Sequence, residues 1–125
     1  MIGDLVYVEL PLNLDKLDET FAFYQTFFGW KIQESFLLNQ RYFIFETPGK
    51  KFYGGFDSSI KPHQDGINLY IHVDSIEDIL NRIKKDYQHL PILRGKTLIS
   101  KEDGSYALIT DPSGNKIGIN EYPKD

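Results

Sequence analysis

Two short segments, at equivalent places in the two halves of the chain, alternate apolar with polar or aromatic residues. Residues 5–10 and 67–73 each predict a strand with one aliphatic face, because every second side chain on that face is Val, Leu or Ile. The aliphatic positions are Val6, Val8, Leu10, Ile67, Leu69, Ile71 and Val73. The alternate positions hold Leu5, Tyr7, Glu9, Asn68, Tyr70 and His72. We expect the aliphatic faces to pack on helices and the other faces to point away from them.

A helical pattern follows each of these strands. In the first half, Asp15 is a candidate N-cap, and apolar residues then recur on one helical face at Leu17, Phe21, Tyr24 and Phe28. Gly29 is suited to end this helix in the left-handed conformation. In the second half, Ser75 and Asp78 resemble a capping box. The apolar face of that second helix is predicted at Ile76, Ile79, Leu80 and Ile83.

Three further strands are predicted in each half. They cover residues 31–37, 41–47 and 51–56, and then 96–101, 105–110 and 116–121. Pro48-Gly49 marks a turn, and Asp111-Pro112-Ser113-Gly114 has the composition of a type I turn. The polar region 57–66 is predicted to link the halves, giving modules at residues 1–60 and 61–125.

The two halves also resemble each other in sequence. Val6-Tyr7-Val8-Glu9-Leu10 matches Leu69-Tyr70-Ile71-His72-Val73 at a separation of 63 residues. At a separation of 64, the matching residues are Tyr42 and Tyr106, Ile44 and Leu108, Pro48 and Pro112, and Gly54 and Gly118. This duplication predicts an α+β protein of two βαβββ modules whose sheets form incomplete barrels around a shared cavity. Cavities of this kind bind small molecules.

Composition narrows the functional classes. The net charge is -4 and no basic stripe is visible, which argues against nucleic acid as a partner. No segment has the roughly 20 apolar residues that span a bilayer, and the N-terminus does not resemble a signal peptide. The sequence contains no cysteine, which fits a reducing compartment. These features favour a cytoplasmic protein without a membrane partner.

Strand parity selects the candidate site residues. Glu9 and His72 occupy matching positions on the presumed cavity face and could form an acid–base pair, with one of them as general base. The alternative is that Glu9 holds a neighbouring donor and His72 lies near the rim. By the same parity the ligand-binding candidates are Tyr7, Phe52, Phe56, Asn68, Tyr70 and Asn120. They predict an aromatic pocket with a few orienting amides, although such rings could also simply fill a small barrel.

Several ordered motifs resemble a known superfamily. They are Phe21-Ala22-Phe23-Tyr24, Phe28-Gly29-Trp30, Gly54-Gly55-Phe56, Tyr70-Ile71-His72-Val73-Asp74, and Asp111-Pro112-Ser113-Gly114-Asn115-Lys116-Ile117. Together they resemble the vicinal oxygen chelate superfamily, which contains glyoxalase I, bleomycin-resistance proteins and extradiol dioxygenases. The resemblance is greatest to its glyoxalase-related branch and covers essentially the whole chain. It implies paired βαβββ modules, usually in a homodimer.

The resemblance also implies where a metal would bind. Metal-using members take one ligand from the first strand and one from the last strand of each module. In this sequence those positions are Tyr7 (or Leu5 in a shifted register), Gly54 (or Gly55), Asn68 and Gly118. Glycine has no side chain and Leu or Asn are poor replacements for His, so we expect no metal site.

Three functional hypotheses follow from the sequence. The leading one is binding of a small organic ligand in the cavity without a metal. The alternative is a metal-dependent lyase, isomerase or dioxygenase of the glyoxalase type with an altered metal site. A third is a structural or regulatory domain whose interior is filled by side chains.

Overall fold

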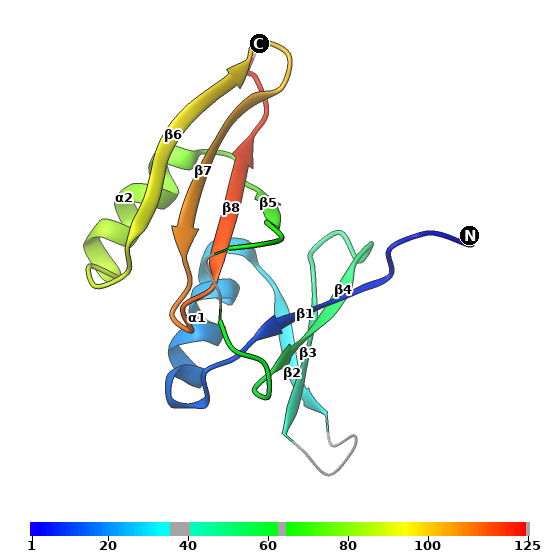
Figure 1. Ribbon diagram of the computed structural model, residues 1–125. Helices are drawn as coiled ribbons and strands as arrows, with labels where there is room; N and C mark the ends of the chain where they lie inside the picture. The colour runs from blue at the N-terminus through cyan, green and yellow to red at the C-terminus, as the bar shows by residue number, and fades with distance from the viewer. Residues whose placement is uncertain (36–40, 63–64, 125) are drawn as a thin grey trace. The chain divides into compact units, whose positions relative to one another are not determined.

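The computed structural model describes residues 1–35, 41–62 and 65–124, which form two compact units. The first unit covers Met1–Pro62 and the second covers His63–Asp125. Each unit contains one α-helix and one open four-stranded sheet, as the ribbon in Figure 1 shows. The prediction of an α+β protein with two βαβββ modules is therefore confirmed.

The first unit runs β1 (Tyr7–Pro11), a 3-10 helix (Leu14–Lys16), α1 (Leu17–Phe28), β2 (Lys31–Ser35), β3 (Tyr42–Glu46) and β4 (Tyr53–Asp57). The strand order is β1-β4-β3-β2, with β1 and β4 parallel and the other pairs antiparallel. The second unit runs β5 (Tyr70–His72), α2 (Ile76–Asp86), β6 (Ile92–Ser100), β7 (Gly104–Thr110) and β8 (Lys116–Glu121). Its order, β5-β8-β7-β6, repeats the first, again with a parallel pair at the outer strand.

Aromatic rings form the core between α1 and its sheet. The Trp30 ring stacks between Tyr24, at 4.6 Å between centroids, and Phe45, at 4.2 Å. Phe56 is fully buried and contacts Phe21 and Tyr24, at 5.4 and 5.5 Å between centroids. Burying several rings of this size supplies most of the apolar stabilisation of the unit.

The start of α1 differs from the prediction, and its end does not. The Asn13 side chain, not that of Asp15, is the cap: its Oδ1 accepts a hydrogen bond from the Asp15 backbone N–H at 3.0 Å. This cap begins the 3-10 helix, and α1 follows at Leu17 without a side-chain cap. Gly29 ends α1 with a φ of 68°, which is the left-handed conformation predicted for it.

The second helix matches its prediction closely. Ser75 Oγ accepts a hydrogen bond from the Asp78 backbone N–H at 3.1 Å. The four residues predicted to face the sheet, Ile76, Ile79, Leu80 and Ile83, are all buried. A long-range hydrogen bond also stabilises the start of α2, since Glu121 Oε1 accepts from the Ile76 backbone N–H at 2.9 Å. The sequence does not reveal this contact.

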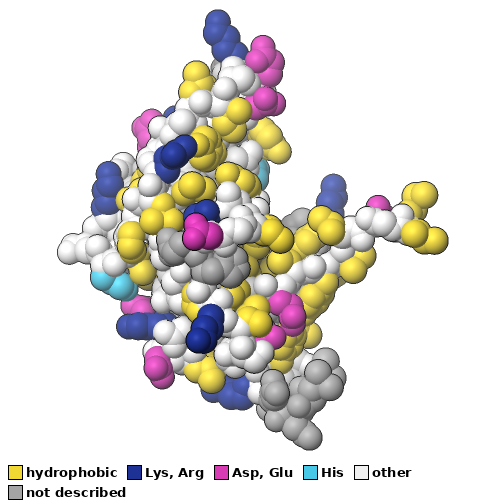
Figure 2. Space-filling model, viewed as in Figure 1, with side chains coloured by type: hydrophobic (Ala, Val, Ile, Leu, Met, Phe, Trp, Pro, Cys, Tyr) yellow, Lys and Arg dark blue, Asp and Glu magenta, His cyan; other side chains and the backbone are white. Residues whose placement is uncertain are grey.

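The first strand of each unit is shorter at its start than the alternation predicts. β1 begins at Tyr7, and the preceding Leu5 and Val6 are exposed by 87% and 74%. Figure 2 shows hydrophobic side chains along this N-terminal segment. Likewise β5 begins at Tyr70, and Ile67 is 82% exposed. Leu5, Val6 and Ile67 lie before the first ladder pair of their strands, so no described residue of the neighbouring strand pairs with them and buries them.

The Asp111–Gly114 turn closes as predicted. The Gly114 backbone N–H donates to the Asp111 carbonyl at 3.0 Å. The buried Asp111 carboxylate also accepts hydrogen bonds from the backbone N–H and the side-chain amide of Asn115, both at 2.9 Å. As for membrane spans, no helix in the described ranges combines the length and the apolar character that crossing a bilayer requires.

Candidate functional site

The sheet of the first unit has one face packed on α1 and a second face that carries no helix of this unit. We call the second one the open face. Strand alternation and the ladder register assign to it Tyr7 and Glu9 of β1, Tyr53 and Gly55 of β4, Tyr42, Ile44 and Glu46 of β3, and Lys31 and Gln33 of β2. The open face therefore gathers hydroxyl, carboxylate, amide and ammonium groups beside exposed aromatic rings.

A hydrogen-bond chain runs across the open face. The Tyr42 hydroxyl donates to Glu9 Oε2 at 2.8 Å, and the hydroxyls of Tyr7 and Tyr42 lie 2.8 Å apart. A hydroxyl has one proton, so Tyr42, having donated to Glu9, accepts from Tyr7. Partial burial, followed by the hydrogen bonds to Tyr7 and Glu9, raises the pKa of Tyr42 well above its ordinary value. Tyr42 therefore stays protonated, and the hydrogen bonds run in one direction, from Tyr7 to Tyr42 to Glu9.

Two adjacent glycines of β4, Gly54 and Gly55, make room for aromatic side chains on the two faces of the sheet. A Cβ atom at Gly55 would overlap the hydroxyl and the Cζ of Tyr42. A Cβ atom at Gly54 would overlap the Phe45 ring and the Val8 carbonyl on the helix-covered face. Gly55 thus gives Tyr42 the space to reach Glu9, while Gly54 gives Phe45 its place in the core.

A hollow of about 200 Å³ lies on the same sheet. It is lined by Lys31, Ile32, Gln33, Ile44, Glu46 and Tyr53. Five of these six belong to the open face, and Lys31 lies directly opposite Glu46 across the β2–β3 ladder. The hollow and the hydroxyl chain therefore lie on one continuous surface of β1, β4, β3 and β2.

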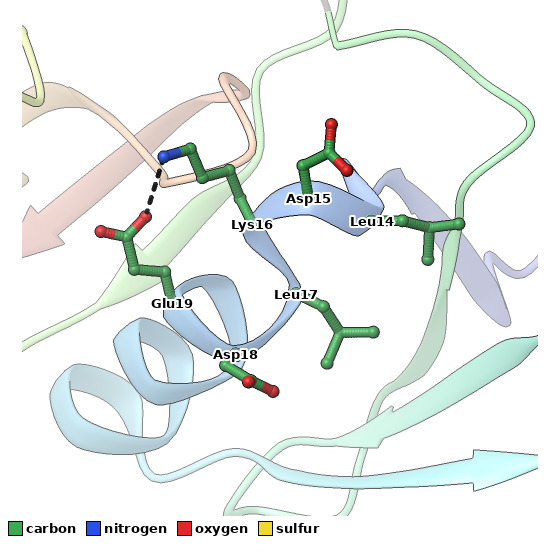
Figure 3. A pocket seen from close by; sticks show the side chains of 6 residues that line it. All are labelled: Leu14, Asp15, Lys16, Leu17, Asp18 and Glu19. Carbon is green, nitrogen blue, oxygen red and sulfur yellow. Dashed lines mark ion pairs between the residues drawn. The ribbon is translucent and has the colours of Figure 1, made fainter.

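A second hollow, of about 330 Å³, lies where α1 begins and is lined by Leu14, Asp15, Lys16, Leu17, Asp18 and Glu19. Figure 3 shows the Lys16 and Glu19 side chains turned toward each other, and their charged atoms are 3.8 Å apart. None of the site residues predicted from the sequence lies in this hollow.

The second unit has an equivalent face of different composition. Tyr70 pairs with Gly118 and His72 with Asn120 across the β5–β8 ladder. A Cβ atom at Gly118 would meet the Tyr70 ring, so this glycine also leaves space for a tyrosine. Elsewhere on this sheet, Arg94 donates to the Tyr106 hydroxyl at 2.6 Å. The His72 ring lies 4.6 Å from that of Tyr122.

The predicted site residues are therefore divided among several places. Tyr7 and Glu9 lie on the open face of the first unit. Tyr70, His72 and Asn120 lie together in the second. Asn68 is exposed just before β5. The hypothesis that Glu9 and His72 meet as an acid–base pair stays a prediction.

The assignment of Phe56 to a cavity face is wrong. Phe56 is fully buried against Phe21 and Tyr24 of α1. Alternation along β4 puts Tyr53 and Gly55 on the open face and therefore puts Phe56 on the opposite face. Phe52 precedes β4 and is half-buried, and its carbonyl accepts a hydrogen bond from Thr47. The parity of the last strand was thus one residue out of phase with the prediction.

Several residues of the open face were not identified from the sequence. Tyr42 and Ile44 were recognised only as repeated positions, and no role was assigned to Tyr53, Lys31, Gln33 and Glu46. A usable signal exists in residues 42–46, where Tyr, Ile and Glu alternate with two Phe residues. The buried positions Phe43 and Phe45 identify the other three as members of the opposite face.

The same register corrects the proposed equivalence of Gly54 and Gly118. Tyr7 pairs with Tyr53 and its counterpart Tyr70 with Gly118, while Ile44 pairs with Gly55 and its counterpart Leu108 with Gly118. The two ladders therefore match Gly118 with Tyr53 or Gly55, and neither matches it with Gly54. By strand alternation, the β4 positions on the open face are Tyr53, Gly55 and Asp57. Within the described ranges, no three or more His, Cys, Asp or Glu residues gather where they could hold a metal ion. The residues at the implied metal positions do not fit such a site.

Known proteins resemble this chain at the level of structure. No family model matches the sequence, and no curated protein matches it either. Solved structures do match over nearly the full length. The antibiotic-binding protein TnmS3 from Streptomyces sp. CB03234 is 17% identical, with a TM-score of 0.70 and 98% of each chain covered. The fold is that of the vicinal oxygen chelate superfamily.

Two other superfamily structures support this assignment. The fosfomycin resistance protein FosX from Listeria monocytogenes, complexed with Mn(II) and sulfate, is 16% identical with a TM-score of 0.71, covering 98% of this chain and 92% of FosX. A putative glyoxalase family protein from Bacillus anthracis is 17% identical with a TM-score of 0.67, covering 98% of this chain and 97% of that one. At these identities the likeness concerns the fold. The resemblance noticed in the sequence motifs is confirmed at that level.

Proposed function

We propose that this protein binds a small organic ligand on the open face of its first unit without using a metal ion. The observation that carries the proposal is the 200 Å³ hollow on the same sheet face as the Tyr7–Tyr42–Glu9 chain. A concave surface with aromatic and aliphatic walls and a few oriented polar groups is typical of a small-molecule site.

The lining supports binding of an organic molecule with both apolar and polar parts. Ile44 and Tyr53 provide apolar contact area, while Gln33, Lys31 and Glu46 provide donors and acceptors. Tyr7 and Tyr53 are exposed by 43% and 44%, so ligand contact would remove substantial ring surface from water.

The residues at the implied metal positions support a metal-independent function. Tyr53 and Gly55 on β4 and Gly118 on β8 stand where side-chain ligands would be needed. The alternative, a metal-dependent lyase, isomerase or dioxygenase, would need a different donor set. Glu9 and His72 stay the candidate acid–base pair of a reaction that uses no metal.

The superfamily neighbours include both kinds of protein. TnmS3 is an antibiotic-binding protein, and one FosX structure is complexed with Mn(II). We propose the binding function for this chain on the ground of its own open face. We also propose a homodimer in the cytoplasm, which sedimentation equilibrium would test against the chain mass of 14.5 kDa and cell fractionation against other compartments.

Thermal-shift screening tests the proposal. The purified protein would be screened with aromatic compounds and thiol conjugates, with and without a chelator, because a ligand that binds only the native state raises the unfolding temperature. We expect hits whose shift persists in chelator. Stoichiometric bound metal, together with loss of every shift in chelator, would instead support the metal-dependent alternative.

A matched pair of variants locates the binding site. Ile44→Arg places a long charged side chain in the hollow and should abolish the shift produced by a hit compound. Ile99→Arg makes the same change at a residue of β6 that is already 52% exposed, and should leave the shift intact. Equal binding by both variants would place the ligand elsewhere.

A further inference from the structure

We infer that the open face selects ligands that carry a protonated amine next to a flat apolar body, with the Glu9 carboxylate as the anchor of the ammonium group. This inference rests on the proposed function and specifies its ligand class. Three features of the described residues support it: the direction of the hydroxyl chain, the distribution of charge and the placement of the rings.

The direction of the hydroxyl chain leaves acceptors available to a ligand. Tyr42 uses its single proton on Glu9 Oε2, and Tyr7 uses its proton on Tyr42. At the two ends of this hydrogen-bond chain, the lone pairs of the Tyr7 oxygen and the second carboxylate oxygen of Glu9 remain available to a ligand. These groups accept hydrogen bonds and none is left to donate, so they match a ligand that brings its own N–H donors.

The charge distribution favours a cation. Lys31 lies directly opposite Glu46 across the β2–β3 ladder, an arrangement in which opposite charges attract each other. Within the described ranges, no ion pair joins Glu9 to a Lys or Arg side chain. Arg41, the cation next to β3 in sequence, pairs instead with Glu34 at 3.0 Å. A glycine, Gly55, lies opposite Glu9 on the neighbouring strand, so the Glu9 charge is available to a cationic ligand.

The rings next to Glu9 provide the surface for a flat apolar body. Tyr7 and Tyr53 lie side by side across the β1–β4 pair, and both are more than two-fifths exposed. Gly55 lies directly opposite Glu9, and because it has no side chain, the Tyr42 ring can lie over it. An ammonium group held by Glu9 would also lie close to the electron-rich tyrosine rings, which attract cations.

Three probes of the same shape but different charge test this inference. They are 2-naphthylmethylamine, 2-naphthalenemethanol and 2-naphthoate, titrated into isotopically labelled protein while backbone amide shifts are recorded by NMR. We expect the amine to bind with about fivefold preference over the alcohol, which corresponds to an exposed charge pair at the upper end of its usual strength. The largest shifts should lie in β1, β3 and β4.

Two isosteric variants identify the anchor. Glu9→Gln should remove the preference for the amine while the alcohol binds as before. Glu102→Gln makes the same change in net charge at an exposed residue of the second unit and should preserve the preference. High salt should also reduce the preference for the amine in the unmodified protein, and it should have no such effect in Glu9→Gln.

The outcomes separate the two levels of the proposal. Equal binding of all three probes, or a preference for the carboxylate, would overturn the ligand class while leaving the binding function in place. An amine preference that survives in Glu9→Gln would overturn the role of Glu9. Failure of every probe to shift the amides of β1, β3 and β4 would overturn the proposed function of the open face and the inference with it.

Discussion

The adjacent glycines of β4 give a direct test of the two faces of the first sheet. Alanine at Gly54 introduces a methyl group that overlaps a backbone carbonyl, that of Val8, and the buried Phe45 ring. Neither can move without separating β1 from β4 or displacing the core. Overpacking of this kind costs about 1–3 kcal/mol, and the backbone contact places Gly54→Ala at about 3 kcal/mol.

The same substitution one residue later has a different cost. At Gly55 the new methyl group meets the end of the Tyr42 side chain, which can swing away from the sheet. The loss is then two hydrogen bonds, about 2 kcal/mol in total, offset by about 1 kcal/mol because alanine is less flexible than glycine in the unfolded chain. We expect Gly55→Ala to reduce stability by only about 1 kcal/mol, and to disconnect Glu9 from Tyr42.

Urea denaturation and a spectroscopic alkaline titration of the tyrosines separate these effects. Gly54→Ala should lose stability and keep a tyrosine that resists ionisation, because its new methyl group lies on the face of β4 opposite to Tyr42. Gly55→Ala should remain stable and lose that resistance, since Tyr42 no longer occupies its hydrogen-bonded position. The reasoning would be refuted if Gly55→Ala were the less stable variant or if its tyrosines titrated as in the unmodified protein.

Three further predictions concern single side chains. Because the pKa of Tyr42 is raised in the folded protein, its hydrogen-bonded hydroxyl contributes fully to stability below the ordinary tyrosine pKa of 10.0, and this contribution is lost as the pH rises above that value. Urea melts at several pH values should therefore show a shallower alkaline loss of stability for Tyr42→Phe than for the unmodified protein. Glu121 has a lowered pKa, chiefly because it accepts the Ile76 N–H; Glu121→Ala should cost about 1 kcal/mol at neutral pH, and circular dichroism melts should show that difference shrinking as the pH falls through the lowered pKa. Asp111→Ala removes both hydrogen bonds that the buried carboxylate accepts from Asn115 and should cost about 2–4 kcal/mol in chemical denaturation; a cost below about 1 kcal/mol would contradict this account of the turn.

The sequence by itself determined the features that depend on neighbouring residues. The buried face of α2, the Gly29 terminator and the Asp111–Gly114 turn could all be read from short-range patterns. Each depends on the conformational preferences of a few consecutive residues, and those preferences are expressed in the sequence itself. The internal duplication extended this local reading to the order of elements in both units.

The tertiary structure alone decided which side chains share the open face. Aromatic residues occur on both faces of β4, so the character of Phe56 and Tyr53 does not reveal which of them lies under α1. That choice is made by the β1–β4 register, which pairs Tyr7 with Tyr53 and Glu9 with Gly55, residues 46 apart in the chain. A shift of one residue in this register would exchange the two faces completely, and only the packing of the aromatic core against α1 selects between the alternatives.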